Sequence, residues 1–108
     1  MTSADKLSEQ LQNLWQKHLP LMQSRVATIR VAIDALRQNR LTQEIRATAK
    51  EAAHKLAGSL GTFGLESASR DALEIERLLT NNVGDRGNGA LLDQYLTQIK
   101  HAIDSRGR

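Results

Sequence analysis

The sequence predicts an all-α fold, an antiparallel up-down-up-down four-helix bundle with an additional N-terminal helix. Three observations support this prediction. Proline occurs once in 108 residues and β-branched residues are sparse, while Ala, Leu, Gln, Arg and Glu are abundant. Apolar residues recur at spacings of three and four, as on one face of a helix. The expected helices are joined by short turns, which favours antiparallel packing in a single domain over residues 1–108.

The first two helices are predicted on either side of Pro20. A first helix over about residues 4–18, with Ser3 as a possible N-cap, has an apolar stripe of Leu7, Leu11, Leu14 and Trp15. We expect it to pack beside or across one end of the bundle. Pro20 stops or bends the chain and can begin the next helix. That helix, over about 20–38, has the stripe Met22, Val26, Ile29, Ile33 and Leu36.

Three further helices follow. The third, over about 42–62, can be capped by Thr42 or Asn39 and ended by Gly64, and its stripe is Ile45, Ala49, Ala52, Leu56, Leu60 and Phe63. The fourth spans about 66–81 and has the stripe Leu65, Ala68, Ala72, Ile75 and Leu79. The glycine-rich stretch 83–89 predicts an exposed loop. The last helix, over about 89–104, has the stripe Leu92, Tyr95 or Leu96, Ile99 and Ile103.

Composition limits the possible functions. The net charge of +3 comes from dispersed basic residues, and only three residues are aromatic, so no nucleic-acid interface is expected. Without cysteine there is no disulfide, thiolate zinc site or thiol nucleophile. The chain has no apolar run of 18 residues and no export signal pattern. We therefore expect a cytoplasmic monomer that needs no cofactor and does not insert into membranes.

The most informative feature is the outward face of the third helix. On a helical wheel, His54 lies almost opposite the apolar stripe, and Gly58 and Gly61 lie on the same face as His54. A glycine inside a helix costs about 1 kcal/mol relative to alanine. Two glycines on one exposed face therefore indicate that something approaches the backbone closely beside the imidazole.

The surroundings of His54 indicate group transfer. Lys50 lies on the same face and Lys55 on its flank, and together they could attract an anion such as a phosphoryl group. An exposed imidazole is a competent nitrogen nucleophile. Because a convex helix face offers no cleft for a small substrate, we expect a group carrier whose partner supplies the rest of the active site.

The segment Ala53-His54-Lys55-Leu56-Ala57-Gly58-Ser59, with Gly64 ten residues after His54 and Ile75-Glu76 on the next helix, resembles the signature of histidine-containing phosphotransfer (HPt) domains. The resemblance implies a four-helix bundle that shuttles a phosphoryl group between aspartates of response-regulator receiver domains. The phosphoryl group would travel through a phosphohistidine at His54 in a two-component phosphorelay that begins at a hybrid sensor histidine kinase. No kinase motif is present, so no autonomous kinase activity is expected.

The resemblance also implies roles for other residues. Gly58 would leave room for the receiver, and Ser59 and Glu76 would lie near the imidazole. The family commonly has lysine three residues after the histidine, where this chain has Ala57. Lys50 and Lys55 are therefore expected to support the phosphohistidine instead. The variable surface expected to contact the receiver includes Lys50, Glu51, Lys55, Gly61 and Thr62.

Other interpretations remain open. Glu51 and His54 have the Glu-x-x-His spacing of di-iron bundles, but such a site needs two of these motifs facing inward, so we expect no metal site. The chain could also be a helical adaptor without chemistry, or the phosphoacceptor domain of a chemotaxis-type histidine kinase. His18 is expected to end the first helix, and His101 to be partly exposed on the last.

Overall fold

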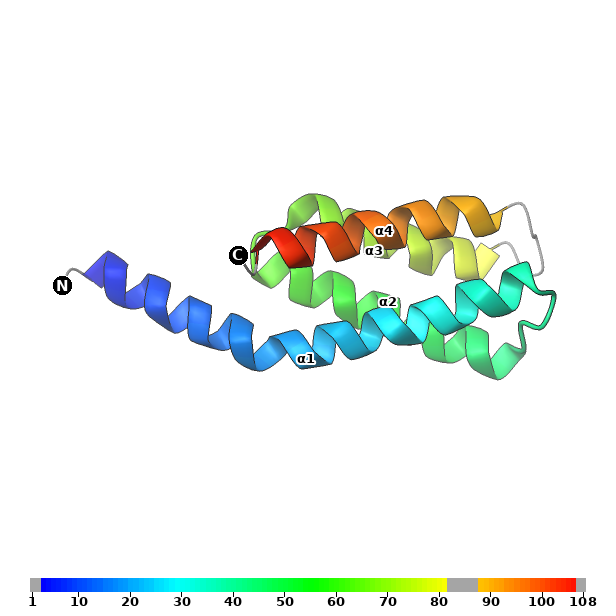
Figure 1. The fold of residues 1–108 in the computed structure, drawn as a ribbon, viewed down its shortest axis with the longest axis horizontal. Coiled ribbons are helices and arrows are strands. Elements are labelled where there is room, and N and C mark those ends of the chain that lie inside the picture. Colours follow the sequence, from blue (N-terminus) through cyan, green and yellow to red (C-terminus); the bar gives the residue numbers. More distant parts are fainter. Residues whose placement is uncertain (1–2, 82–87, 107–108) are drawn as a thin grey trace.

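The computed structural model describes residues 3–81 and 88–106, and within these ranges the regular structure is entirely α-helical. The helices are α1 (Ser3–Arg37), α2 (Gln43–Thr62), α3 (Glu66–Asn81) and α4 (Asn88–Arg106). They lie side by side in Figure 1, where α1 packs on α2 and α4, and α3 packs on the same two helices. The all-α prediction is confirmed.

The predicted division of the N-terminal region into two helices is wrong. One continuous helix, α1, replaces them, and Pro20 lies inside it. Proline has no N–H to donate to the carbonyl four residues earlier, and its ring crowds that carbonyl, so a kink is the usual result. Pro20 is exposed, and so is Gln16, the residue four positions earlier. Figure 1 shows α1 bending in its blue N-terminal part rather than ending there.

The N-terminal part of α1 projects past the other three helices (Figure 1). Its leucines are exposed, with exposed fractions of 65% for Leu7, 41% for Leu11 and 56% for Leu14. Only Trp15 of the predicted stripe is fully buried, and its ring meets the Phe63 ring edge-on at 5.2 Å between centroids. The expectation that the whole segment packs against the bundle is therefore wrong for these leucines.

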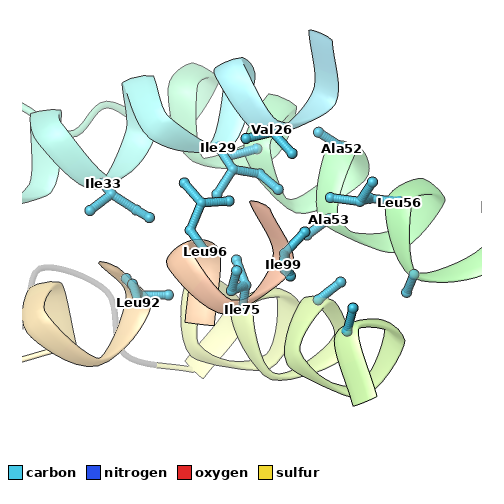
Figure 2. Packing of buried hydrophobic residues seen from close by; sticks show 14 of the residues in the cluster. Val26, Ile29, Ile33, Ala52, Ala53, Leu56, Ile75, Leu92, Leu96 and Ile99 are labelled. Carbon is cyan, nitrogen blue, oxygen red and sulfur yellow. The ribbon is translucent and has the colours of Figure 1, made fainter. Parts of the chain in front are cut away.

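The core lies between the four helices and begins at Trp15. Figure 2 shows aliphatic side chains from α1 and α2 meeting those of α3 and α4. The largest fully buried side chains are Trp15, Met22, Ile29, Ile33, Leu56, Leu60, Ile75, Leu92, Leu96 and Ile99. At the position left open between Tyr95 and Leu96, Leu96 is buried and Tyr95 lies at the margin of the core.

Both ends of α2 follow the sequence prediction. The Thr42 hydroxyl caps the first turn by accepting a hydrogen bond from the Ile45 N–H at 3.1 Å. Beyond the last turn, Gly64 has φ +78°, a conformation that glycine adopts without a steric penalty. The Leu65 N–H then bonds to the Leu60 carbonyl at 2.9 Å, which closes the helix. These two caps fix the length of the helix that carries His54.

The glycine-rich stretch lies largely outside the described residues, which resume at Asn88, the first residue of α4. Gly89 is buried in α4 rather than part of a loop. A Cβ at this position would lie 2.8 Å from Cγ of Arg37. A larger residue at position 89 would therefore collide with the Arg37 side chain, which packs over this glycine.

Candidate functional site

His54 lies in the middle of α2, on the side that faces away from the core. Its side chain is 70% exposed, whereas the preceding Ala53 is fully buried. The core stripe predicted for this helix is present, because Ala49, Leu56 and their neighbours on that face are buried. The outward orientation of His54 predicted from the helical wheel therefore matches the structure.

Glu76, on α3, holds one nitrogen of the imidazole. Its Oε1 lies 3.2 Å from Nδ1 of His54, and the Glu76 side chain is 30% exposed. An ionised carboxylate only accepts hydrogen bonds, so this contact places a proton on Nδ1. The other nitrogen, Nε2, has no hydrogen-bond partner among the described residues and keeps its lone pair. The pair thus selects the tautomer in which Nε2 carries the free lone pair and is able to act as a nucleophile.

The two lysines near His54 have different surroundings. Lys50 lines a shallow depression of about 350 Å³ together with His54, Glu76 and Glu51. Lys55 instead pairs with Glu51 at 2.7 Å between Nζ and Oε1, and this contact lowers the pKa of the Glu51 carboxyl. Lys50 is therefore the cation that shares the depression with the imidazole.

The two glycines also differ. A Cβ at Gly58 would meet no atom within 4 Å, so the space above this backbone is open. A Cβ at Gly61 would lie 3.6 Å from the Ser69 hydroxyl, in ordinary contact with α3. The Thr62 hydroxyl donates to the Gly58 carbonyl at 3.0 Å on the same side of α2. Gly58 thus leaves the helix backbone accessible one turn from His54.

Ser59 lies on the α1 side of α2, not beside the imidazole of His54. Its hydroxyl accepts a hydrogen bond from Nη1 of Arg25 at 3.2 Å and lies 2.9 Å from Nε2 of His18. Five residues along a helix correspond to about 140° around it, so Ser59 and His54 cannot share a face. The helical wheel alone places Ser59 and His54 on different faces of α2. The expectation that Ser59 lies near the imidazole came from the family resemblance.

His18 does not end a helix. It lies inside α1, and its ring is tilted against that of Phe63 with 6.0 Å between centroids. His101 is exposed on α4, as expected. Neither histidine shares the surroundings of His54.

A groove between α1 and α2 was not predicted from the sequence. This α1–α2 groove has a volume of about 570 Å³ and is lined by Leu11, Leu14, His18, Arg25, Lys55, Gly58, Ser59, Thr62 and Phe63. The signal in the sequence is the leucine spacing of the first segment, which was expected to pack beside or across one end of the bundle. Leu11 and Leu14, which are exposed, form one wall of the groove.

Within residues 3–81 and 88–106, no group of three or more His, Asp or Glu side chains is arranged to hold a metal ion. None of the described helices has the length and apolar character needed to cross a membrane.

Comparison with known proteins identifies one family. The family model described as "Hpt domain" matches residues 1–106, which is nearly the whole chain. No curated protein and no solved structure matches the chain.

Proposed function

Because the chain belongs to the Hpt domain family, we propose that it carries a phosphoryl group on His54 between receiver domains of a two-component phosphorelay. The observation that supports His54 is its geometry. The imidazole is exposed on a convex face, and Glu76 occupies Nδ1 and leaves Nε2 unbonded. On such a convex face, rapid transfer depends on a partner that holds its phosphoryl group in position beside the imidazole.

The proposed step is a displacement at phosphorus. The lone pair of His54 Nε2 forms the N–P bond while the bond between phosphorus and the aspartyl oxygen of the receiver breaks. The aspartate leaves as a carboxylate, and the proton on Nδ1 stays in place. The ring gains positive charge, which the Glu76 carboxylate 3.2 Å away offsets. The reverse step passes the phosphoryl group to another receiver.

The proposed supporting roles follow the geometry. Lys50 would attract the phosphoryl group, since it shares the depression with His54. Lys55 would act at the edge of the site, because it is paired with Glu51. Gly58 would admit the receiver, while Glu51, Gly61 and Thr62 would contribute to the surface that meets it.

The proposal includes the setting of the chain. Its partners would be response-regulator receiver domains and a hybrid sensor histidine kinase, in the cytoplasm, with the chain acting as a monomeric single domain. The short connections at 38–42 and 63–65 support an up-down-up-down order of the helices, and such an order brings Glu76 beside His54.

Phosphorylation of the purified chain tests the proposal. We expect phosphoramidate, or a phosphorylated receiver, to produce a phosphate on the chain that is labile in acid and stable in base. His54→Gln should abolish this phosphate. His101→Gln, which removes another exposed histidine, should keep it.

Two results would contradict the proposal. Persistence of the phosphate in His54→Gln would assign it to another residue. A wild-type chain that stays unmodified by phosphoramidate and by several active receivers would favour the adaptor interpretation.

A further inference from the structure

We propose that the α1–α2 groove is a binding site for a small organic phosphate, with the phosphate group against Arg25 and Ser59 and an apolar body against Leu14 and Phe63. This site is separate from His54, and the inference goes beyond the proposed function and does not depend on it.

The polar end of the groove has an arginine without a charged partner. Nη1 of Arg25 donates to the Ser59 hydroxyl at 3.2 Å, and Nε2 of His18 lies 2.9 Å from the same hydroxyl oxygen. No carboxylate lies within ion-pair distance of the half-buried Arg25 in residues 3–81 and 88–106. An arginine side chain has five N–H donors, so this guanidinium can bind a further acceptor. The oxygens of a phosphate fit such a planar donor well.

The charge around this end favours an anion over a neutral polar group. Lys55 is a second cation that lines the groove, although Glu51, which does not line it, pairs with the lysine at 2.7 Å. Of the described residues that line the groove, none is a carboxylate. A phosphate monoester carries about −1.5 to −2 charges at pH 7 and offers several acceptor oxygens. It can therefore accept hydrogen bonds from Arg25 and Lys55 together.

The apolar end of the groove lies one helical turn from the polar end on both helices. Leu14 precedes His18 by four residues, and Phe63 follows Ser59 by four, which corresponds to about 6 Å in each case. The two steps run in the same direction, because the rings of His18 and Phe63 are 6.0 Å apart. The ligand that fits is therefore a phosphate joined directly to a compact apolar body. The groove volume of about 570 Å³ is typical of small-molecule sites.

The groove and the depression at His54 differ in charge. No side chain lines both of them. The depression contains the carboxylates of Glu51 and Glu76, whereas the groove has an apolar wall and Arg25. An organic phosphate therefore finds both a cation and an apolar surface only in the groove.

A titration with 1-naphthyl phosphate, followed by amide chemical shifts in nuclear magnetic resonance, tests this inference. We expect saturable binding with a Kd of about 0.1 mM and the largest shifts near Leu14, Ser59 and Phe63. Inorganic phosphate, which lacks the apolar body, and 1-naphthol, which lacks the charge, should each bind at least about tenfold more weakly.

Two variants and one control locate the probe. Arg25→Gln should weaken binding about tenfold, and Leu14→Gln, at a side chain that is 56% exposed, about fivefold. Lys100→Gln, which removes an exposed cation on α4, should keep the Kd within about twofold of wild type. Thermal unfolding would verify that each variant is folded.

Several results would overturn the inference. These are binding that does not saturate below about 10 mM, equal affinity for 1-naphthol and its phosphate ester, or an unchanged Kd in Arg25→Gln. Loss of binding in Lys50→Gln but not in Arg25→Gln would assign the probe to the depression at His54 instead. The titration uses no receiver and no phosphodonor, so its outcome is separate from that of the phosphorylation test of the proposed function.

Discussion

Residues 15–36 and residues 3–14 of α1 both carry apolar side chains at spacings of three and four, but their environments differ. The later stripe, from Trp15 to Leu36, is buried against α2 and α4. In the earlier segment, Leu7 and Leu14 are more than half exposed. We refer to these two parts as the packed half and the projecting half of α1.

The difference shows what periodicity can predict. Leu14 lies about 100° from its neighbour Trp15 on the helix, but Leu11 lies five complete turns from the buried Ile29 and is therefore aligned with the core stripe. Leu11 is nevertheless 41% exposed, because this part of α1 projects past the other three helices (Figure 1). An isolated helix of about twelve residues is only marginally stable in water. The projecting half therefore presents a face that a partner could cover.

The largest difference in stability is expected between two alanine substitutions at neighbouring residues, one in the packed half of α1 and one in the projecting half. Trp15→Ala should lower the free energy of unfolding by about 3–5 kcal/mol, because it leaves a cavity beside Phe63. Leu14→Ala should change it by less than about 0.5 kcal/mol, since its side chain is 56% exposed. Urea unfolding followed by circular dichroism measures both. Similar losses in the two variants would show that the projecting half packs in solution as tightly as the packed half.

An intermediate effect is expected at Gly58, which lies on an exposed face of α2 and lines the α1–α2 groove. Gly58→Gln should raise the free energy of unfolding by about 0.7 kcal/mol, because it removes a helix-interior glycine at a position with open space. Transfer from a phosphorylated receiver should fall by about 100-fold, since the longer side chain displaces the receiver. Rapid-quench transfer assays and urea unfolding provide the two readouts.

Gly58→Ala is the matched control for this prediction. It should raise the free energy of unfolding by about 1 kcal/mol, slightly more than Gly58→Gln, because alanine has the higher helix propensity and its Cβ meets no atom within 4 Å in the free chain. Its loss of transfer should be smaller, because its side chain is short. Undiminished transfer in Gly58→Gln would show that the receiver does not approach the backbone here.

The smallest effect is expected at the polar edge of the packed half. Asp93 on α4 accepts hydrogen bonds from Arg30 at 2.6 Å and Arg37 at 2.8 Å, and the Arg30 contact lowers the pKa of the Asp93 carboxyl. Asp93→Asn should cost about 0.5 kcal/mol at pH 7, as is typical of surface ion pairs. A lowered pKa in the folded state means that this contribution is lost as the pH falls below about 4.

The pH dependence of the Asp93 pairs can be measured by urea unfolding at pH 7 and near pH 3. The difference between wild type and Asp93→Asn should shrink at the lower pH. Asp104→Asn is the control, because no ion pair of this α4 carboxylate occurs among the described residues. If the stability difference between wild type and Asp93→Asn were larger near pH 3 than at pH 7, the stabilising role of the Asp93 ion pairs would be contradicted.

Much of the site could be predicted from the sequence because it lies within one regular helix. The stripe of α2 and the outward position of His54 follow from 3.6 residues per turn, and Thr42 and Gly64 mark the helix ends by local chemistry. The same geometry should have separated Ser59 from His54. There the family resemblance gave the wrong neighbour, because a motif describes positions in the chain and not the faces of a helix.

Contacts between helices were harder to predict. The distance from Glu76 to His54 depends on how α3 packs on α2, and the α1–α2 groove depends on which face of α1 meets α2. Pro20 marked a disturbance of the helix correctly. Whether the chain ended or only bent at that point depended on packing on both sides of the proline.

The sequence by itself determined that this chain is helical, where most helices begin and end, and that His54 points away from the core, because these properties depend on local propensity and on the period of a helix. The tertiary structure alone decided that α1 is continuous, that its first leucines are exposed, and that Ser59 contacts α1 while Glu76 contacts His54. These contacts join residues that are 22 to 41 positions apart. An apolar stripe specifies only that something should cover it, and the packing of the other helices decides whether that cover comes from the same chain.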